Sequence, residues 1–84
     1  MSQTFDRTER ISELFFEAVN IEVESSDQDL IESGLLDSLS FVEMLLQIER
    51  EFGVDVGVAG FEIDDFRTVK TIAAYVDRHS PQLA

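Results

Sequence analysis

A serine stands where the longest apolar helical pattern of the chain begins. The stretch GLLDSLSFVEM (residues 34–44) places Asp37 and Ser38 between a Leu-Leu pair and apolar residues at helical spacing. Asp and Ser are both common N-cap residues, so one of the pair can simply satisfy free amide groups of the first turn. Alternatively, Ser38 is presented for covalent modification, because a helix N-terminus favours an attached phosphate. In that case the Asp37 carboxylate is a ligand for a divalent cation during phosphoryl transfer.

The helix that begins at Asp37 or Ser38 is predicted to run to Phe52 and to stop at Gly53. On a helical wheel its apolar residues form two groups. The group expected to face the core is Phe41, Met44, Leu45, Ile48 and Phe52. The second group is Leu39, Val42 and Leu46, bordered by Glu43, Glu49 and Arg50. This second group is either more core, buried by another neighbour, or an apolar patch with a charged rim that docks on a partner.

The other elements are predicted from the same periodicity. A first helix spans residues 5–19, from Phe5 to Val19, and a long loop covers residues 20–37. Six apolar residues are expected to pin this loop onto the core: Ile21, Val23, Leu30, Ile31, Leu35 and Leu36. From Gly53 we expect an irregular stretch with three glycines, Gly53, Gly57 and Gly60, and then a single helical turn at FEIDDF (residues 61–66). Thr68 is the expected N-cap of the last helix, and Pro81 lies beyond its end.

These elements predict an all-α fold in one domain, residues 1–84: a small four-helix bundle of three main helices and a short third helix, with a long loop between helices 1 and 2. The length allows one modest core, and 44% hydrophobic residues with seven Phe are enough to fill it.

Composition excludes several classes of function. The net charge of −12 argues against nucleic acid and anionic membranes as partners and favours basic surfaces on other proteins. There is no cysteine, and hence no disulfide or thiolate site. The sequence shows neither a membrane span nor a secretory signal, which favours the cytoplasm.

No catalytic group or metal site is predicted. Asp27 and Asp29 lack the spacing of a calcium loop, because Ile31 and Glu32 occupy positions where that loop needs a ligand and a glycine. His79, the only histidine, is expected to complement the dipole at a helix C-terminus.

The chain resembles the acyl and peptidyl carrier proteins. The likeness rests on Asp37-Ser38-Leu39 within LIESGLLDSLSFVEMLLQIEREFGVDV (residues 30–56), and on the spacing to Thr68 and TIAAYV (residues 71–76). It implies that Ser38 receives 4′-phosphopantetheine from coenzyme A, transferred by a separate phosphopantetheinyl transferase that uses magnesium. It also implies that the protein is not an enzyme: the cofactor brings the thiol that the sequence lacks, and the protein carries an acyl group on it as a thioester.

By the same resemblance, Leu39, Val42 and Leu46 match the partner-facing apolar positions of the family. Asp37, Glu43 and Glu49 match its acidic recognition residues, whereas Arg50 departs from the acidic pattern of fatty-acid carriers.

Within the family, ESGLLDS, IEREFGVDV and the Phe61, Phe66, Thr68 spacing are most similar to the D-alanyl carrier type. We therefore predict a free-standing, monomeric carrier of an aminoacyl or short acyl group. An adenylating ligase loads it, and an acyltransferase or synthase of a natural-product or cell-envelope pathway unloads it. The alternatives are a fatty-acid or polyketide carrier and, in another class, an unmodified acidic helical adaptor in which Ser38 is only a cap.

Overall fold

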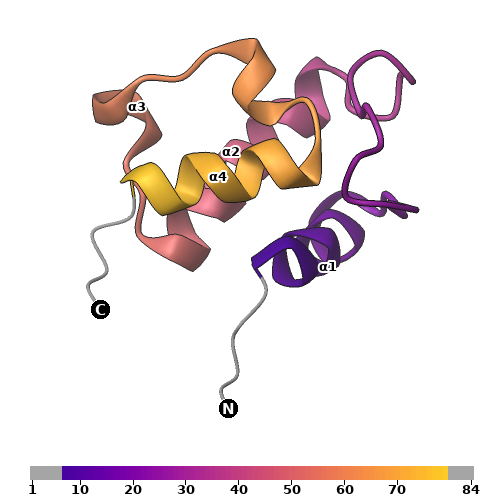
Figure 1. Ribbon diagram of the computed structural model, residues 1–84, viewed down its shortest axis with the longest axis horizontal. Helices are drawn as coiled ribbons and strands as arrows, with labels where there is room; N and C mark the ends of the chain where they lie inside the picture. Colours follow the sequence, from indigo (N-terminus) through magenta and orange to yellow (C-terminus); the bar gives the residue numbers. More distant parts are fainter. Residues whose placement is uncertain (1–6, 80–84) are drawn as a thin grey trace.

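The computed structural model describes residues 7–79 of the chain, and these residues contain helices but no strand. The predicted start of the first helix at Phe5 and the position of Pro81 lie outside this range. In chain order the elements are α1 (Arg7–Val19), α2 (Ser38–Phe52), α3 (Val56–Ala59), the 3-10 turn η1 (Ile63–Phe66) and α4 (Val69–His79) (Figure 1). The all-α prediction, with three main helices and a long loop before α2, is confirmed.

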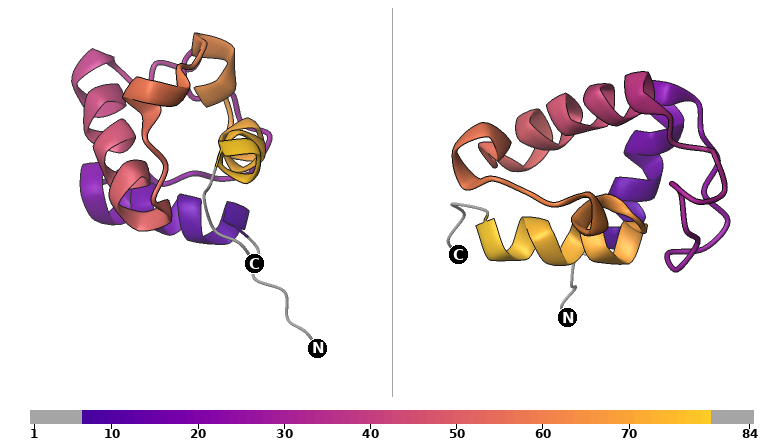
Figure 2. Two further views of the ribbon diagram at one scale, coloured as in Figure 1. Left: turned by 90° about the vertical axis from the view of Figure 1, so that its left-hand side faces the viewer. Right: turned by 90° about the horizontal axis from the view of Figure 1, so that it is seen from above.

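The three long helices surround the core. α2 and α4 run in the same direction along two sides of the molecule, and α1 crosses them at a steep angle (Figure 2). α1 packs against both of the other helices, and η1 packs against α4. The most deeply buried side chains come from all of these elements and from the long loop: Ile11, Phe15, Leu30, Met44, Ile48, Phe66, Val69, Ile72, Tyr75 and Val76.

The ends of α2 follow from local chemistry, and the predicted bounds are confirmed. The Asp37 carboxylate accepts a hydrogen bond from the backbone N–H of Ser40 at 2.9 Å. At the other end Gly53 adopts φ +73°, a left-handed conformation that glycine reaches without steric cost. Its N–H donates to the Glu49 carbonyl at 3.0 Å. The serine at the start of this helix is therefore held at a defined position.

α4 begins as predicted, directly after Thr68. The Thr71 N–H donates to Thr68 Oγ1, and the Thr68 N–H donates to Thr71 Oγ1, both at 3.1 Å. This reciprocal pair satisfies two amide groups at the helix start, as a capping box does.

The loop over residues 20–37 is anchored at both its middle and its end. Leu30 is fully buried, and its N–H donates to the Arg67 carbonyl at 2.8 Å. Leu36 is also buried, whereas Leu35 is 38% exposed, so the prediction that Leu35 pins the loop is wrong. Gly34, at φ +81°, turns the chain just before this pair, and Leu36 alone reaches the core.

The stretch between α2 and η1 is more ordered than the sequence predicts. Residues 53–60 were expected to be irregular, yet they contain α3, which is held by the Asp55 carboxylate accepting from the Val58 N–H at 3.2 Å. Only one turn forms, because Gly60 ends it. The predicted helical turn at residues 61–66 is present as η1.

Aromatic side chains fix η1 against the long helices. Phe66 lies edge-to-face with Phe41 of α2, with ring centroids 5.7 Å apart, and 5.1 Å from the ring of Tyr75 of α4. The Tyr75 hydroxyl donates to the Gly60 carbonyl at 2.6 Å. His79, at the end of α4, packs its ring 4.4 Å from that of Tyr75. η1 is thereby held beside the start of α2.

Candidate functional site

The cap of α2 is Asp37. The Asp37 carboxylate accepts a hydrogen bond from the Ser40 N–H. The Asp37 backbone carbonyl accepts another from the Phe41 N–H at 2.8 Å. The hydrogen bonds from Ser40, the backbone N–H first, hold the pKa of the Asp37 carboxyl below its ordinary value. Asp37 is therefore ionised at neutral pH and lies at the positive end of the helix dipole.

Ser38 is the first residue of α2 and has no part in capping it. Its side chain is exposed. Within residues 7–79 its hydroxyl has no hydrogen-bond partner. The question left open by the sequence, whether Asp37 or Ser38 is the cap, is thus decided for Asp37. A hydroxyl that the fold does not use stands at the N-terminus of a 15-residue helix.

A shallow apolar hollow of about 230 Å³ adjoins Ser38. It is lined by residues from the long loop, the first turn of α2 and η1: Ile31, Leu36, Asp37, Ser38, Phe41 and Ile63. Because Ile63 is distant from Ser38 in sequence, periodicity alone did not reveal this hollow. It places an apolar surface beside the Ser38 hydroxyl.

The second apolar group of α2 is exposed. Leu39 is 79% exposed, Val42 52% and Leu46 50%, whereas Met44 and Ile48 on the opposite side are buried. The interpretation of these three residues as additional core is therefore wrong. They form an apolar stripe along α2, starting one residue after Ser38, which we call the α2 stripe.

The charged residues around the α2 stripe differ in their surroundings. Glu43 accepts a hydrogen bond from Gln47 Nε2 at 3.2 Å, one turn further along the helix. The Glu49 carboxylate accepts from the Val56 N–H at 3.0 Å and so ties the end of α2 to α3. Arg50 is exposed in the last turn of α2, where a cation complements the helix dipole.

The exposure of three apolar residues beyond α2 was not predicted from the sequence. Val58 of α3 is 83% exposed, Ile63 of η1 51% and Phe61 between them 39%. The absence of regular periodicity in this short, glycine-containing stretch left no sequence signal for their exposure. They extend the apolar surface beyond α2 onto the segment that follows it.

A further hollow lies between the two helices that meet near the serine. It has a volume of about 380 Å³. It is lined by Ala18 and Val19 at the end of α1, by the N-cap residue Asp37, and by Leu39, Ser40, Val42 and Glu43 of α2. We call it the α1–α2 hollow. It connects the α2 stripe to the last turn of α1.

The described part of the chain offers neither a membrane-spanning helix nor a metal-binding cluster. None of the helices within residues 7–79 is long and apolar enough to cross a membrane. Within the same range, no group of three or more His, Asp or Glu side chains is arranged to hold a metal ion.

Comparisons with known proteins agree with this geometry. The model of the family described as "Phosphopantetheine attachment site" matches residues 9–76. A D-alanyl carrier protein of Streptococcus pyogenes serotype M5 (strain Manfredo) is 38% identical over 75 residues, covering 89% of this chain and 84% of the relative. Among solved structures, that of KstB-PCP in its apo form aligns with a TM-score of 0.66 at 22% identity, over 88% of this chain and 87% of the other. This last similarity is one of fold.

The matched region contains α2, with Ser38 at its start, and extends from α1 into α4. The chain therefore belongs to the phosphopantetheine attachment-site family of carrier proteins.

Proposed function

We propose that Ser38 is the attachment residue for 4′-phosphopantetheine and that the protein carries an aminoacyl or short acyl group on this cofactor. The observation that carries the proposal is the division of roles at the start of α2: Asp37 caps the helix, and the exposed Ser38 hydroxyl has no hydrogen-bond partner among the described residues. When bound, the cofactor supplies a thiol, which the protein itself lacks, and holds the cargo as a thioester.

The residues around Ser38 fit such a group. The N-terminus of α2 favours a phosphate, and the ionised Asp37 carboxylate offers an oxygen ligand to the magnesium ion of a phosphopantetheinyl transferase. Ile63 and Phe41, which line the hollow beside Ser38, offer apolar contact to the arm. The chain acts as the carrier to which the cargo is tethered, and this tethering raises the effective concentration of the cargo at each partner.

The size of the hollow supports a small cargo. Its volume of about 230 Å³ is below the roughly 300–1,000 Å³ of common ligand pockets, so a long chain would remain largely outside it. The relative that is named a D-alanyl carrier protein also favours an aminoacyl cargo. A fatty-acid or polyketide carrier is the second candidate, and it requires this hollow to widen.

The α2 stripe supports the proposal that enzymes dock beside Ser38. Leu39, Val42 and Leu46 present apolar surface, and Asp37 and Glu43 add negative charge near the helix start. Weak contacts steered by charge suit a carrier that must leave each enzyme quickly. The expected partners are a phosphopantetheinyl transferase, an adenylating ligase and an acyltransferase or synthase.

The test is the intact mass of the protein after incubation with coenzyme A, magnesium and a broad-specificity phosphopantetheinyl transferase. We expect one phosphopantetheine group on the parent protein and none on Ser38→Ala, with circular dichroism unchanged between the two. The matched control is Ser40→Ala, two residues away, which should be modified as the parent is. Modification of Ser38→Ala, or none of the folded parent, would refute the assignment, and the latter result would favour the unmodified adaptor.

A further inference from the structure

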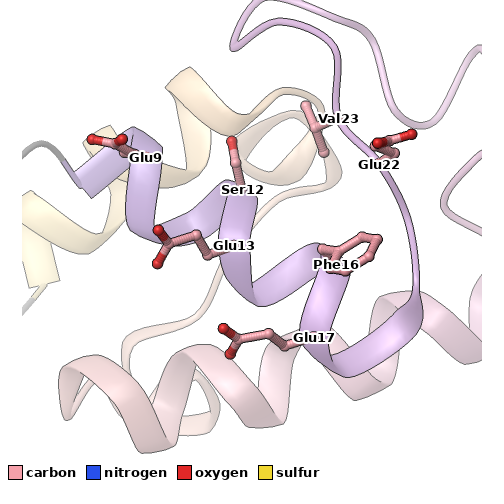
Figure 3. A pocket seen from close by; sticks show the side chains of 7 residues that line it. All are labelled: Glu9, Ser12, Glu13, Phe16, Glu17, Glu22 and Val23. Atoms are coloured by element: carbon pink, nitrogen blue, oxygen red, sulfur yellow. The ribbon is translucent and has the colours of Figure 1, made fainter.

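A third hollow, with its own apolar and charged residues, lies on the outer face of α1, outside the site at Ser38. It has a volume of about 400 Å³ and lies between α1 and the segment that follows it (Figure 3). Phe16 and Val23 provide apolar surface, and four carboxylates surround them: Glu9, Glu13, Glu17 and Glu22. We call this the α1 groove.

Phe16 has no role in the core. Its neighbour Phe15 and the nearby Ile11 are fully buried, whereas Phe16 is 55% exposed. In Figure 3 the Phe16 ring projects from α1 toward the segment that carries Glu22 and Val23. A large exposed aromatic ring beside a hollow is typical of an anchor point for a partner side chain.

The charges around the α1 groove are almost all negative. Among the described residues that line it there is no lysine or arginine. Arg10 reaches Glu13 at 3.0 Å and Glu17 at 3.6 Å, but its guanidinium also makes a bidentate pair with Glu51 of α2. Glu9 and Glu22 form no ion pair with any described residue. The groove therefore keeps a net negative charge.

This combination indicates the chemistry of the occupant. A second copy of the chain, at a net charge of −12, would be repelled, as would nucleic acid or an anionic membrane. An arginine side chain satisfies both features, because its guanidinium stacks on an aromatic ring and pairs with carboxylates. The molecule already makes such contacts: the Arg7 guanidinium lies 5.5 Å from the ring centroid of Phe52.

We propose that the α1 groove is a second docking surface, which receives an arginine-bearing, partly apolar segment of a partner protein. The α1 groove and the α1–α2 hollow lie about one helical turn apart along α1. Val19, which lines the α1–α2 hollow, lies three residues from Phe16 and is thus its neighbour on the helix surface. One enzyme can therefore cover the α2 stripe and reach Phe16 across the end of α1.

This extension rests on the proposed function, since it takes the partner to be an enzyme that serves the carrier. A partner that contacts both surfaces binds more tightly than one that contacts the α2 stripe alone. The α1 groove thereby distinguishes between enzymes that all need Ser38.

The test uses the full chain, labelled with nitrogen-15, and the peptide acetyl-Leu-Arg-Trp-Arg-Leu-amide as the probe. We expect saturable shifts of the backbone amides of Phe16, Glu17 and Val23. Phe16→Ala should weaken binding about three- to tenfold, the range of an exposed cation–π contact with its apolar surroundings. Val58→Ala, which truncates an apolar residue that is 83% exposed on α3, should leave the dissociation constant unchanged.

A pair of charge-matched variants distinguishes binding in the α1 groove from attraction to the acidic surface in general. Glu22→Gln and Glu32→Gln each remove one exposed carboxylate, but only Glu22 lines the groove. We expect Glu22→Gln alone to weaken binding of the peptide about two- to threefold, which is the effect of losing a partly screened ion pair. Ser38→Ala should bind the peptide as the parent does, so this test is independent of the attachment of the cofactor.

Four outcomes would overturn the proposal. They are the absence of saturable binding, shifts spread over all acidic surfaces with equal effects of the two Gln variants, shifts centred on the α2 stripe, and concentration-dependent self-association of the free protein through Phe16.

Discussion

At the scale of single residues, two neighbours at the start of α2 differ in role: Asp37 caps the helix, and Ser38 does not. The Asp37 carboxylate holds the Ser40 N–H, and this leaves the adjacent Ser38 hydroxyl exposed and without a structural use. Had the serine been the cap, its oxygen would be committed to a backbone amide. The Ser38 hydroxyl is thus presented at a fixed position while Asp37 caps the helix, as the proposed attachment of a cofactor requires.

Asp29 gives a prediction about pH. Its carboxylate accepts the N–H groups of Glu32 at 2.8 Å and Ile31 at 3.1 Å, and it pairs with Arg67 at 3.2 Å. The bond from Glu32 is the main cause that lowers the pKa of Asp29 below its ordinary value, with a further contribution from Arg67. Because the folded-state pKa is the lower one, the stabilisation is complete above the unfolded pKa of about 4 and is lost as the pH falls through the folded value.

We therefore expect Asp29→Asn to be less stable than the parent at pH 6, and the difference to shrink as the pH falls below about 4. Urea unfolding at several pH values and constant salt measures it. Acidification also relieves the repulsion among the other carboxylates, but it does so in both proteins, so their difference isolates Asp29. A difference that did not shrink as the pH fell below about 4 would contradict the role given to this carboxylate.

At the scale of elements, α2 has one face for the core and one for solvent. Met44 and Ile48 are buried, and Leu39, Val42 and Leu46 are at least half exposed. The buried face packs α2 against α1. The exposed face begins next to Ser38 and runs along the surface of α2. A helix of this kind can hold the proposed attachment residue, Ser38, and the proposed docking residues of the α2 stripe in one rigid frame.

For the α2 stripe, we predict that Val42→Glu keeps the fold and lowers kcat/KM for a phosphopantetheinyl transferase about tenfold or more, mainly through KM. The reason is that a central apolar contact is replaced by a charge, which must lose its water when the enzyme docks. Ala74→Glu, at an exposed position of α4, is the matched control and should leave the kinetics unchanged. Equal kinetics for Val42→Glu and Ala74→Glu would show that the α2 stripe is not part of the docking surface.

Tyr75 gives a prediction about η1 and the segment before it. Its hydroxyl is the donor to the Gly60 carbonyl, so Tyr75→Phe removes one hydrogen bond and keeps the ring packing against Phe66. We expect a loss of about 1 kcal/mol in the free energy of unfolding, measured with urea. Hydrogen exchange should increase first in residues 57–63. Unchanged stability and exchange would show that this bond does not hold the segment.

At the scale of the whole molecule, charge is the dominant feature. There are eighteen acidic residues against six basic ones, and five of the six are already paired: Arg7, Arg10, Arg67, Lys70 and Arg78. Arg50 forms no ion pair within residues 7–79. Most carboxylates therefore repel one another across the surface, and the same field attracts basic partners.

We expect the melting temperature to rise when sodium chloride increases from about 0.01 to 0.5 M, because the Debye length falls from roughly 30 Å to less than 8 Å. Screening also weakens the surface ion pairs, but these are few and each contributes little. Millimolar magnesium should produce the same rise at a lower ionic strength. A melting temperature that was flat or fell over this range would show that self-repulsion is not significant.

The sequence alone determined the features that depend on neighbours within one helical turn. The Asp37-Ser38 pair and Gly53 mark the ends of α2, and Thr68 marks the start of α4, because caps and left-handed glycines act through bonds three or four residues away. Which member of the pair is the cap was decided only by the structure. The core-facing side of α2 follows from the same short-range periodicity, with Met44 and Ile48 as its deepest members. A resemblance spread over residues 30–76 also sufficed to identify the family.

Only the tertiary structure decided which apolar residues are covered. A wheel places Leu39, Val42 and Leu46 on one side of α2, but whether another element packs on that side depends on contacts between distant parts of the chain. For the same reason the exposure of Leu35 and Phe16, and the position of Ile63 beside Ser38, were not predictable from spacing. Periodicity states which residues share a face, whereas burial is a property of what lies against it.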